Sequence, residues 1–342
     1  MSKRNFIPAP QISRGRGAFF GEFKMSYRTV LRRMKIPMEL LGILGFFWCA
    51  VGLGRAVNKA NDALTRAASA VEHGQFAEAE SGLRVFLREH PGDVRASGLL
   101  GAALDGQQKL GEAERLYREA LRRTPDSVLL LNNYGNHLLR QGDAEGARLE
   151  FEKACSIDPS HQNANLQLAR LAVDRHEGAA ALEFLSRLRD LRTPALQLLR
   201  AEALYWAGCK EESFGVVAGL ENTYDADPRV HFSAGRALSR MGQFARSERA
   251  FSRALAKTPG DPDVLYNLGL AAVGAGHDQR AEADFQTLLR QQPDNVDVLL
   301  ELGRLRERAG DGEGAIALLA KAARLAPKRG DVQRALARAQ AH

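Results

Sequence analysis

The chain has 342 residues, of which 45% are hydrophobic and 26% are charged, and it carries a formal net charge of +7. This length allows two or three ordinary domains or one extended array. Alanine, leucine, arginine and glutamate dominate, and no stretch alternates valine, isoleucine and threonine with polar residues. The composition therefore favours an all-helical fold and argues against a sheet.

The positive charge is confined to the N-terminal end of the chain. Residues 1–35 hold nine lysines and arginines against one acid, Glu22, for a net charge of +8, whereas the remaining residues sum to −1. A basic face on the body of the protein, as nucleic-acid binding requires, is therefore not expected.

An uncharged stretch, LLGILGFFWCAVGL, follows at residues 40–53. Its length suits the apolar core of a signal peptide, and extension to residues 36–57, which include Glu39 and Arg55, makes it long enough to span a bilayer. A basic flank stays on the cytoplasmic side of a membrane. We predict that residues 36–57 form a signal anchor, a single transmembrane helix in the inner (cytoplasmic) membrane of a bacterial-type cell.

In this prediction residues 1–35 are a disordered cytoplasmic segment, and the body is periplasmic. One alternative is secretion after cleavage of the signal, and another is a buried core helix of a soluble fold. Translation from Met25 would also give a compact signal sequence.

Prolines and turn residues recur at a fixed interval beyond residue 60. The prolines are Pro91, Pro125 and Pro159, then Pro259, Pro293 and Pro327. The turn residues are Gly74, Gln108, Gly142, His176, Gly208, Gly242, Gly276 and Gly310, which are 34 residues apart except for one interval of 32. This period and these landmarks resemble the tetratricopeptide repeat (TPR).

The resemblance implies an all-α fold, a right-handed TPR α-solenoid of eight helix-turn-helix repeats, preceded by the N-terminal membrane helix. The eight units would cover residues 60–93, 94–127, 128–161, 162–193, 194–227, 228–261, 262–295 and 296–329. Residues 330–342 would form a polar capping helix over the last unit.

Each unit carries a small residue at its eighth position and most carry a bulky one at the twenty-fourth, as Gly235 and Phe251 do. We expect the small residue to let the two helices of a unit approach closely and the bulky one to fill the space between neighbouring units. Unit four is two residues short, and unit five has Val217 at its twenty-fourth position. The array is therefore expected to bend or loosen over residues 190–228.

No residue pattern indicates an enzyme. The eight histidines are scattered, the three cysteines form no metal or redox motif, and no glycine-rich nucleotide loop occurs. We therefore predict no enzymatic activity, no cofactor, no metal, no nucleic-acid partner and no small-molecule substrate.

The resemblance places a partner-binding groove on the first helix of each unit. Arginines interleaved with aromatic residues in units five to seven would bind a protein or peptide segment, and an acidic one suits their charge. The alternative is that the arginines are only solvated and the aromatic residues pack between helices. Two similar stretches, NNYGN in unit three and YNLG in unit seven, place asparagines on the same face. These asparagines either bond a peptide backbone in the groove or only support local packing. The predicted groove residues are Asn133, Asn136, Arg170, Tyr205, Trp206, Arg229, Phe232, Arg236, Arg240, Tyr266, Asn267 and Arg304.

The function expected from these features is that of a membrane-tethered protein–protein interaction scaffold. The start of unit three is loosely similar to TPR proteins of pilus, secretion or export assembly, which suggests work on an envelope complex. Two alternatives stay open: an accessory subunit that presents substrate to a separate envelope enzyme, and a structural or self-association module that uses its convex face.

Overall fold

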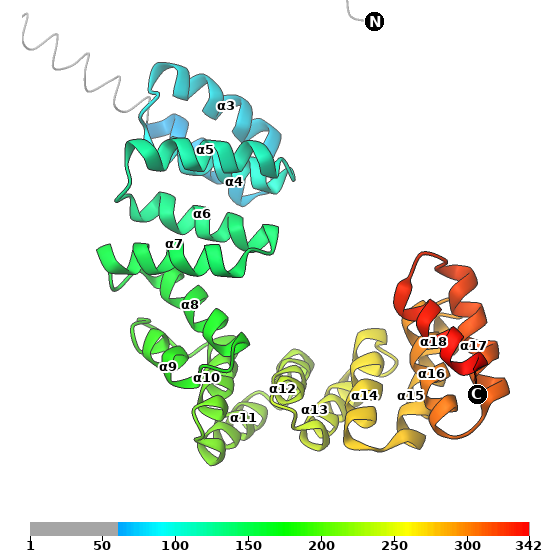
Figure 1. Cartoon of the computed structure of the whole chain (residues 1–342). Helices are drawn as coiled ribbons and strands as arrows, with labels where there is room; N and C mark the ends of the chain where they lie inside the picture. The colour runs from blue at the N-terminus through cyan, green and yellow to red at the C-terminus, as the bar shows by residue number, and fades with distance from the viewer. Residues whose placement is uncertain (1–60, 342) are drawn as a thin grey trace, which may run out of the picture. The chain divides into compact units, whose positions relative to one another are not determined.

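The structure, a computed structural model, describes residues 61–341, which are mostly helical and contain no strand. Residues 61–72 form the first described helix, and the later helices follow in pairs joined by short turns (Figure 1). The first helices of successive pairs are α4 (Val94–Gly106), α6 (Val128–Gln141), α8 (Gln162–Asp174), α10 (Pro194–Trp206), α12 (Pro228–Arg240), α14 (Pro262–Ala275) and α16 (Val296–Arg308).

The second helices of the pairs lie between these, and a last helix follows the eighth pair. They are α3 (Phe76–Glu89), α5 (Leu110–Arg123), α7 (Ala144–Ile157), α9 (Gly178–Ser186), α11 (Lys210–Thr223), α13 (Phe244–Lys257), α15 (Asp278–Gln291), α17 (Gly312–Leu325) and the final α18 (Gly330–Gln340). The expected all-helical TPR solenoid is therefore confirmed for this part of the chain.

Short polar side chains fix where the first helices begin. Asp93, Ser127 and Thr193 accept hydrogen bonds from backbone N–H groups in the first turns of α4, α6 and α10. Asp261 and Asn295 do the same for α14 and α16. Such caps satisfy backbone donors that have no partner within the helix, and they set each unit in register.

The turn inside each unit adopts a left-handed backbone conformation. Glycine provides it in six units, as at Gly142 with φ of 82°. Gln108 and His176 occupy the same place in units two and four, each with φ of 62°. A side chain in this conformation costs free energy that glycine avoids.

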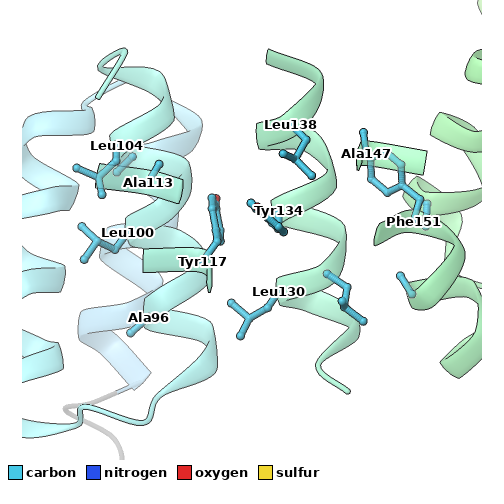
Figure 2. Close-up of a cluster of buried hydrophobic side chains, with 14 of the residues drawn as sticks. Ala96, Leu100, Leu104, Ala113, Tyr117, Leu130, Tyr134, Leu138, Ala147 and Phe151 are labelled. Carbon is cyan, nitrogen blue, oxygen red and sulfur yellow. The ribbon is translucent and has the colours of Figure 1, made fainter. Parts of the chain in front are cut away.

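The glycine at the eighth position of a unit lies under the bulky side chain of the same unit. A Cβ atom added to Gly135 would lie 2.6 Å from the ring of Phe151, and one added to Gly235 would lie 2.7 Å from Phe251. The ring of Tyr117 also faces that of Tyr134 in the next unit, with 5.9 Å between the two ring centroids (Figure 2). The bulky residue therefore packs mainly onto its own unit and only partly fills the space between units.

Each helix packs mainly against its neighbours along the chain. Helix pairs with appreciable contact are consecutive or next but one, such as α12 with α13 and α10 with α12. The chain from Leu64 onward forms one compact unit, so its stability comes from stacking successive pairs.

The short fourth unit is ordered without a full second helix. The helix α9 has nine residues, and residues 187–193 follow without helix. The Gln162 side chain bonds the backbone of Arg187 and Arg189, at 3.3 and 2.8 Å. In unit five, α11 has its full 14 residues. The expected loosening is therefore limited to a loop that side chains hold in place.

The predicted cytoplasmic segment and signal anchor, residues 1–35 and 36–57, lie outside the described residues. Among residues 61–341, no helix combines the length and the apolar character that a membrane span needs.

Candidate partner-binding site

The first helices of units four, five and six, α8, α10 and α12, line a pocket of about 620 Å³. The apolar part of its wall comes from α10 and α12 and includes Leu196, Leu198, Leu199, Val230 and Ala237. Leu198, Val230 and Ala237 are buried, so the wall belongs to the core between these helices. We call this pocket and its rim the α8–α10–α12 site.

Arginines form the rim of the α8–α10–α12 site. Arg170 and Arg236 are exposed, and within the described part of the chain neither makes a hydrogen bond or an ion pair. Arginine in this state offers several N–H donors in a planar arrangement that matches a carboxylate. The site therefore presents, beside an apolar wall, two arginines that no ion pair holds, although the charge of Arg236 also acts on Glu202 of the same site.

The third arginine of the rim, Arg240, is held by two acids. Its Nη2 atom lies 2.5 Å from Asp174 Oδ1, and its Nε atom lies 2.8 Å from Glu202 Oε2. These contacts join α12 to α8 and to α10, so Arg240 fixes the three helices across the site.

The Glu202 carboxyl lies beneath Arg240 and is only 7% exposed. Burial raises its pKa from 4.5 to about 7, because the attraction of Arg240 only partly offsets the loss of water and the charge of Asp174 opposes ionisation. The charge of the site therefore changes close to neutral pH.

The predicted groove residue Arg229 lines the site, but its own neighbour neutralises it. The Nε and Nη2 atoms of Arg229 lie 3.0 and 2.9 Å from the two carboxylate oxygens of Asp227. Asp227 also caps α12. Arg229 therefore offers less free charge to a partner than Arg170 and Arg236 do.

The structure does not bring the four predicted aromatic residues into this pocket. Trp206 stacks on His176, with 3.6 Å between ring centroids, and Tyr205 packs against Trp206 at 5.0 Å. Phe232 lies 5.5 Å from Phe251, and Tyr266 lies 5.9 Å from Phe285. These four rings point toward neighbouring aromatic side chains, and they contribute to packing between helices.

The predicted asparagine Asn133 belongs to a chain of amide hydrogen bonds that joins three first helices. Asn133 donates to the Gly98 carbonyl of α4 at 3.4 Å and accepts from Asn132 at 3.3 Å. Asn163 of α8 donates to Asn132 at 2.8 Å, and Gln167 donates to Asn163 at 3.5 Å. These bonds favour the packing interpretation for Asn133.

The remaining predicted residues lie apart from the α8–α10–α12 site. Asn136 is half-buried on α6, and Asn267 donates to the Asp263 carbonyl of its own helix at 2.8 Å. Arg304 pairs with Glu301 at 2.7 Å and lines a different pocket with Arg338 of the final helix.

Asp174 and Glu202 line the site but are not among the predicted groove residues. What distinguishes them is the contact with Arg240, which lies 66 residues from Asp174 in the chain. In the part of the chain that the structure describes, no group of histidine, cysteine and acidic side chains is placed to hold a metal ion.

Comparison with known proteins gives the family. A tetratricopeptide repeat profile matches residues 64–127, 103–161, 232–277 and 268–330, and a second one matches residues 138–203. No curated protein matches the chain.

Solved structures resemble the chain at low identity. A tetratricopeptide repeat protein from Parabacteroides merdae is 17% identical, with a TM-score of 0.49, over 82% of this chain and 98% of that one. The type IV pilus biogenesis factor PilW is 20% identical, with a TM-score of 0.45, over 61% of this chain and 98% of its own. A chain of the Cut9–Hcn1 APC/C hetero-tetramer is 17% identical, with a TM-score of 0.46, over 77% of this chain and 52% of its own.

All three scores are below 0.5, so the assignment rests on the repeat profiles. These profiles cover more than half of the sequence and agree with the paired helices and their spacing. The chain belongs to the tetratricopeptide repeat family.

Proposed function

We propose that this protein is a scaffold that binds a segment of another protein at the α8–α10–α12 site. The tetratricopeptide repeat fold suggests a protein–protein interaction scaffold. The observation that carries the assignment to this site is the pair Arg170 and Arg236, two exposed arginines that make no hydrogen bond or ion pair among the described residues, beside a partly buried apolar wall. Such a combination suits an extended segment with apolar side chains and a carboxylate.

The test is cross-linking and co-purification with the full-length chain carrying Arg170→Glu and Arg236→Glu. Both side chains are exposed and make no hydrogen bond or ion pair among the described residues, so the double variant is expected to stay folded. Its matched control is Arg249→Glu with Arg324→Glu, which reverses two exposed arginines on the second helices α13 and α17.

A partner captured by the wild-type chain and by the control but lost from the Arg170/Arg236 variant supports the site. A partner that all three chains retain places the interface elsewhere and overturns the assignment.

We further propose that the scaffold is tethered to the bacterial inner membrane and serves an envelope assembly. Two features of the sequence support the membrane tether: the +8 charge of residues 1–35 and the uncharged stretch that follows at residues 40–53. Fractionation and protease treatment of spheroplasts test it. A membrane-bound body that external protease digests supports the proposal, whereas a body that stays in the soluble fraction after lysis and resists external protease overturns it.

A further inference from the structure

A second groove lies on the opposite set of helices, between α5 and α7. It has a volume of about 980 Å³, and its apolar lining includes Leu121 of α5, Ile157 of α7 and, from α6, Leu131 and Tyr134, which are themselves buried. Ile157 is 45% exposed, a large value for an isoleucine in an ordered helix. The groove therefore offers apolar surface to solvent outside the α8–α10–α12 site.

One side of this groove carries a stripe of arginines. Arg115, Arg118 and Arg122 are spaced i, i+3 and i+7 on α5, so they share one helix face. They occupy the twenty-second, twenty-fifth and twenty-ninth positions of unit two, and no other unit has arginine at all three. The stripe is thus a property of this unit and not of the repeat.

Two of these arginines have no acidic partner. Within the described residues Arg122 makes no hydrogen bond or ion pair, and Arg115 donates only to the Gly111 carbonyl, at 3.1 Å. Arg118 pairs with Glu114 at 2.8 Å, and its Nε atom donates to the Tyr134 hydroxyl at 3.0 Å. Arg118 therefore orients the tyrosine of the groove, whereas Arg115 and Arg122 offer free positive charge.

The acids that line the groove cancel only part of this charge. Glu119 pairs with Arg123 and Glu150 pairs with Lys153, at 2.5 and 2.7 Å. Asp126, in the loop after α5, has no such partner in the described part of the chain. The α5 side of the groove is thus positive along the helix, with one acid at its end.

We propose that the groove between α5 and α7 is a second binding site, which takes a short amphipathic segment of another protein. The apolar face of this segment would cover Leu121 and Ile157, and its acidic side chains would pair with Arg115 and Arg122. The stripe from residue 115 to residue 122 is about 10 Å long, which corresponds to two turns of a bound helix.

The probe for this site is a fluorescein-labelled peptide of about twelve residues that alternates pairs of leucines with pairs of glutamates, so that a helix has one apolar and one acidic face. Its binding to the full-length chain is measured by fluorescence anisotropy. The control peptide has lysine in place of glutamate.

The chain provides matched variants. Arg115→Glu with Arg122→Glu reverses the stripe, and Ile157→Asn removes exposed apolar surface. Arg324→Glu and Leu325→Asn change the equivalent positions of unit eight, where Leu325 is 43% exposed. All these side chains are exposed or make no ion pair, and circular dichroism of each variant verifies its fold.

The acidic peptide is expected to bind the wild-type chain and to lose about ten-fold or more in affinity with either groove variant. Arg324→Glu, Leu325→Asn and the Arg170/Arg236 variant should bind it as the wild type does. Absence of binding to the wild type, equal binding to Arg115→Glu/Arg122→Glu, or preference for the lysine peptide would overturn the proposal.

Discussion

His137 of α6 and Asp105 of α4 form a buried contact between units two and three, with 2.5 Å between Nδ1 and Oδ1. Gln141 contacts the other ring nitrogen of His137 at 2.7 Å, and the Tyr117 hydroxyl lies 3.5 Å from Asp105. Burial and the nearby Asp105 raise the pKa of the Tyr117 hydroxyl, so it stays protonated as a donor. The contact between His137 and Asp105 in this polar cluster therefore links units two and three through their side chains.

The first prediction concerns this cluster. Asp105→Leu should lower the free energy of unfolding by about 1–3 kcal/mol, because it leaves the His137 ring and the Tyr117 hydroxyl without their partner in a buried site. Adding His137→Leu should recover part of the loss, since two apolar groups replace the polar pair. Urea unfolding of both single variants and the double variant measures this, and purely additive losses would contradict it.

The second prediction concerns the packing of Gly235 under Phe251. Gly235→Ala should destabilise the chain by about 1–3 kcal/mol, because the added Cβ atom would lie 2.7 Å from the ring. Adding Phe251→Leu should relieve the crowding, since units one and four combine alanine with leucine at these positions. A double-mutant cycle by thermal unfolding checks the coupling. If the Gly235→Ala chain has the same melting temperature as the wild type, the space between Gly235 and the Phe251 ring accommodates a Cβ atom and the prediction is wrong.

The third prediction concerns the left-handed turn at Gln108. Gln108→Gly should raise the free energy of unfolding by about 1 kcal/mol, because glycine adopts φ of 62° without the steric cost that glutamine carries. The reverse change at the equivalent turn, Gly142→Gln, should destabilise by a similar amount. Thermal unfolding of both variants measures their stability relative to the wild type. If both variants are stabilised, or both are destabilised, the explanation is wrong.

The fourth prediction concerns the pH dependence caused by Glu202. Its pKa is about 7 in the folded chain and near 4.5 when unfolded, so between these values the folded state binds more protons. The contribution of Glu202 to the free energy of unfolding is therefore fully present below about pH 4.5. It is lost as the pH rises through 7, and the total loss is about 3 kcal/mol at most.

Glu202→Gln should remove this part of the pH dependence, since glutamine does not ionise. Urea unfolding of the wild type and the variant at about pH 5 and pH 8 measures the difference, and Glu212→Gln serves as an exposed control. A wild type that gains stability relative to Glu202→Gln as the pH rises would contradict the raised pKa.

The repeat could be predicted from the sequence because its landmarks are local. A proline, a turn glycine and a small residue every 34 positions specify the helix pairs, and Gly135 with Phe151 shows such a pair in contact. The candidate site was predicted only in part. Arg170 and Arg236 could be predicted from their positions on the first helices. The orientation of Trp206 could not, because its ring stacks on His176, which lies in the preceding unit.

Contacts between units are harder to predict because they depend on how successive pairs stack. The Arg240–Asp174 pair and the burial of Glu202 require three first helices to be placed together. The groove between α5 and α7 likewise requires the second helices of two units. Composition and periodicity do not specify how helices of different units are placed against one another, so these contacts could not be predicted from the sequence.

The loop of unit four has a consequence for how the array tolerates changes in length. Unit four is two residues shorter than its neighbours, yet the first helices α10, α12, α14 and α16 each start with a side-chain cap and keep a 34-residue spacing. Because each pair contacts mainly adjacent pairs, a deletion at such a junction is absorbed where it occurs. The register of every later unit is preserved, so a change of length at one joint alters the surface beside that joint, as at the α8–α10–α12 site that Thr193 lines, and leaves the units beyond it unchanged.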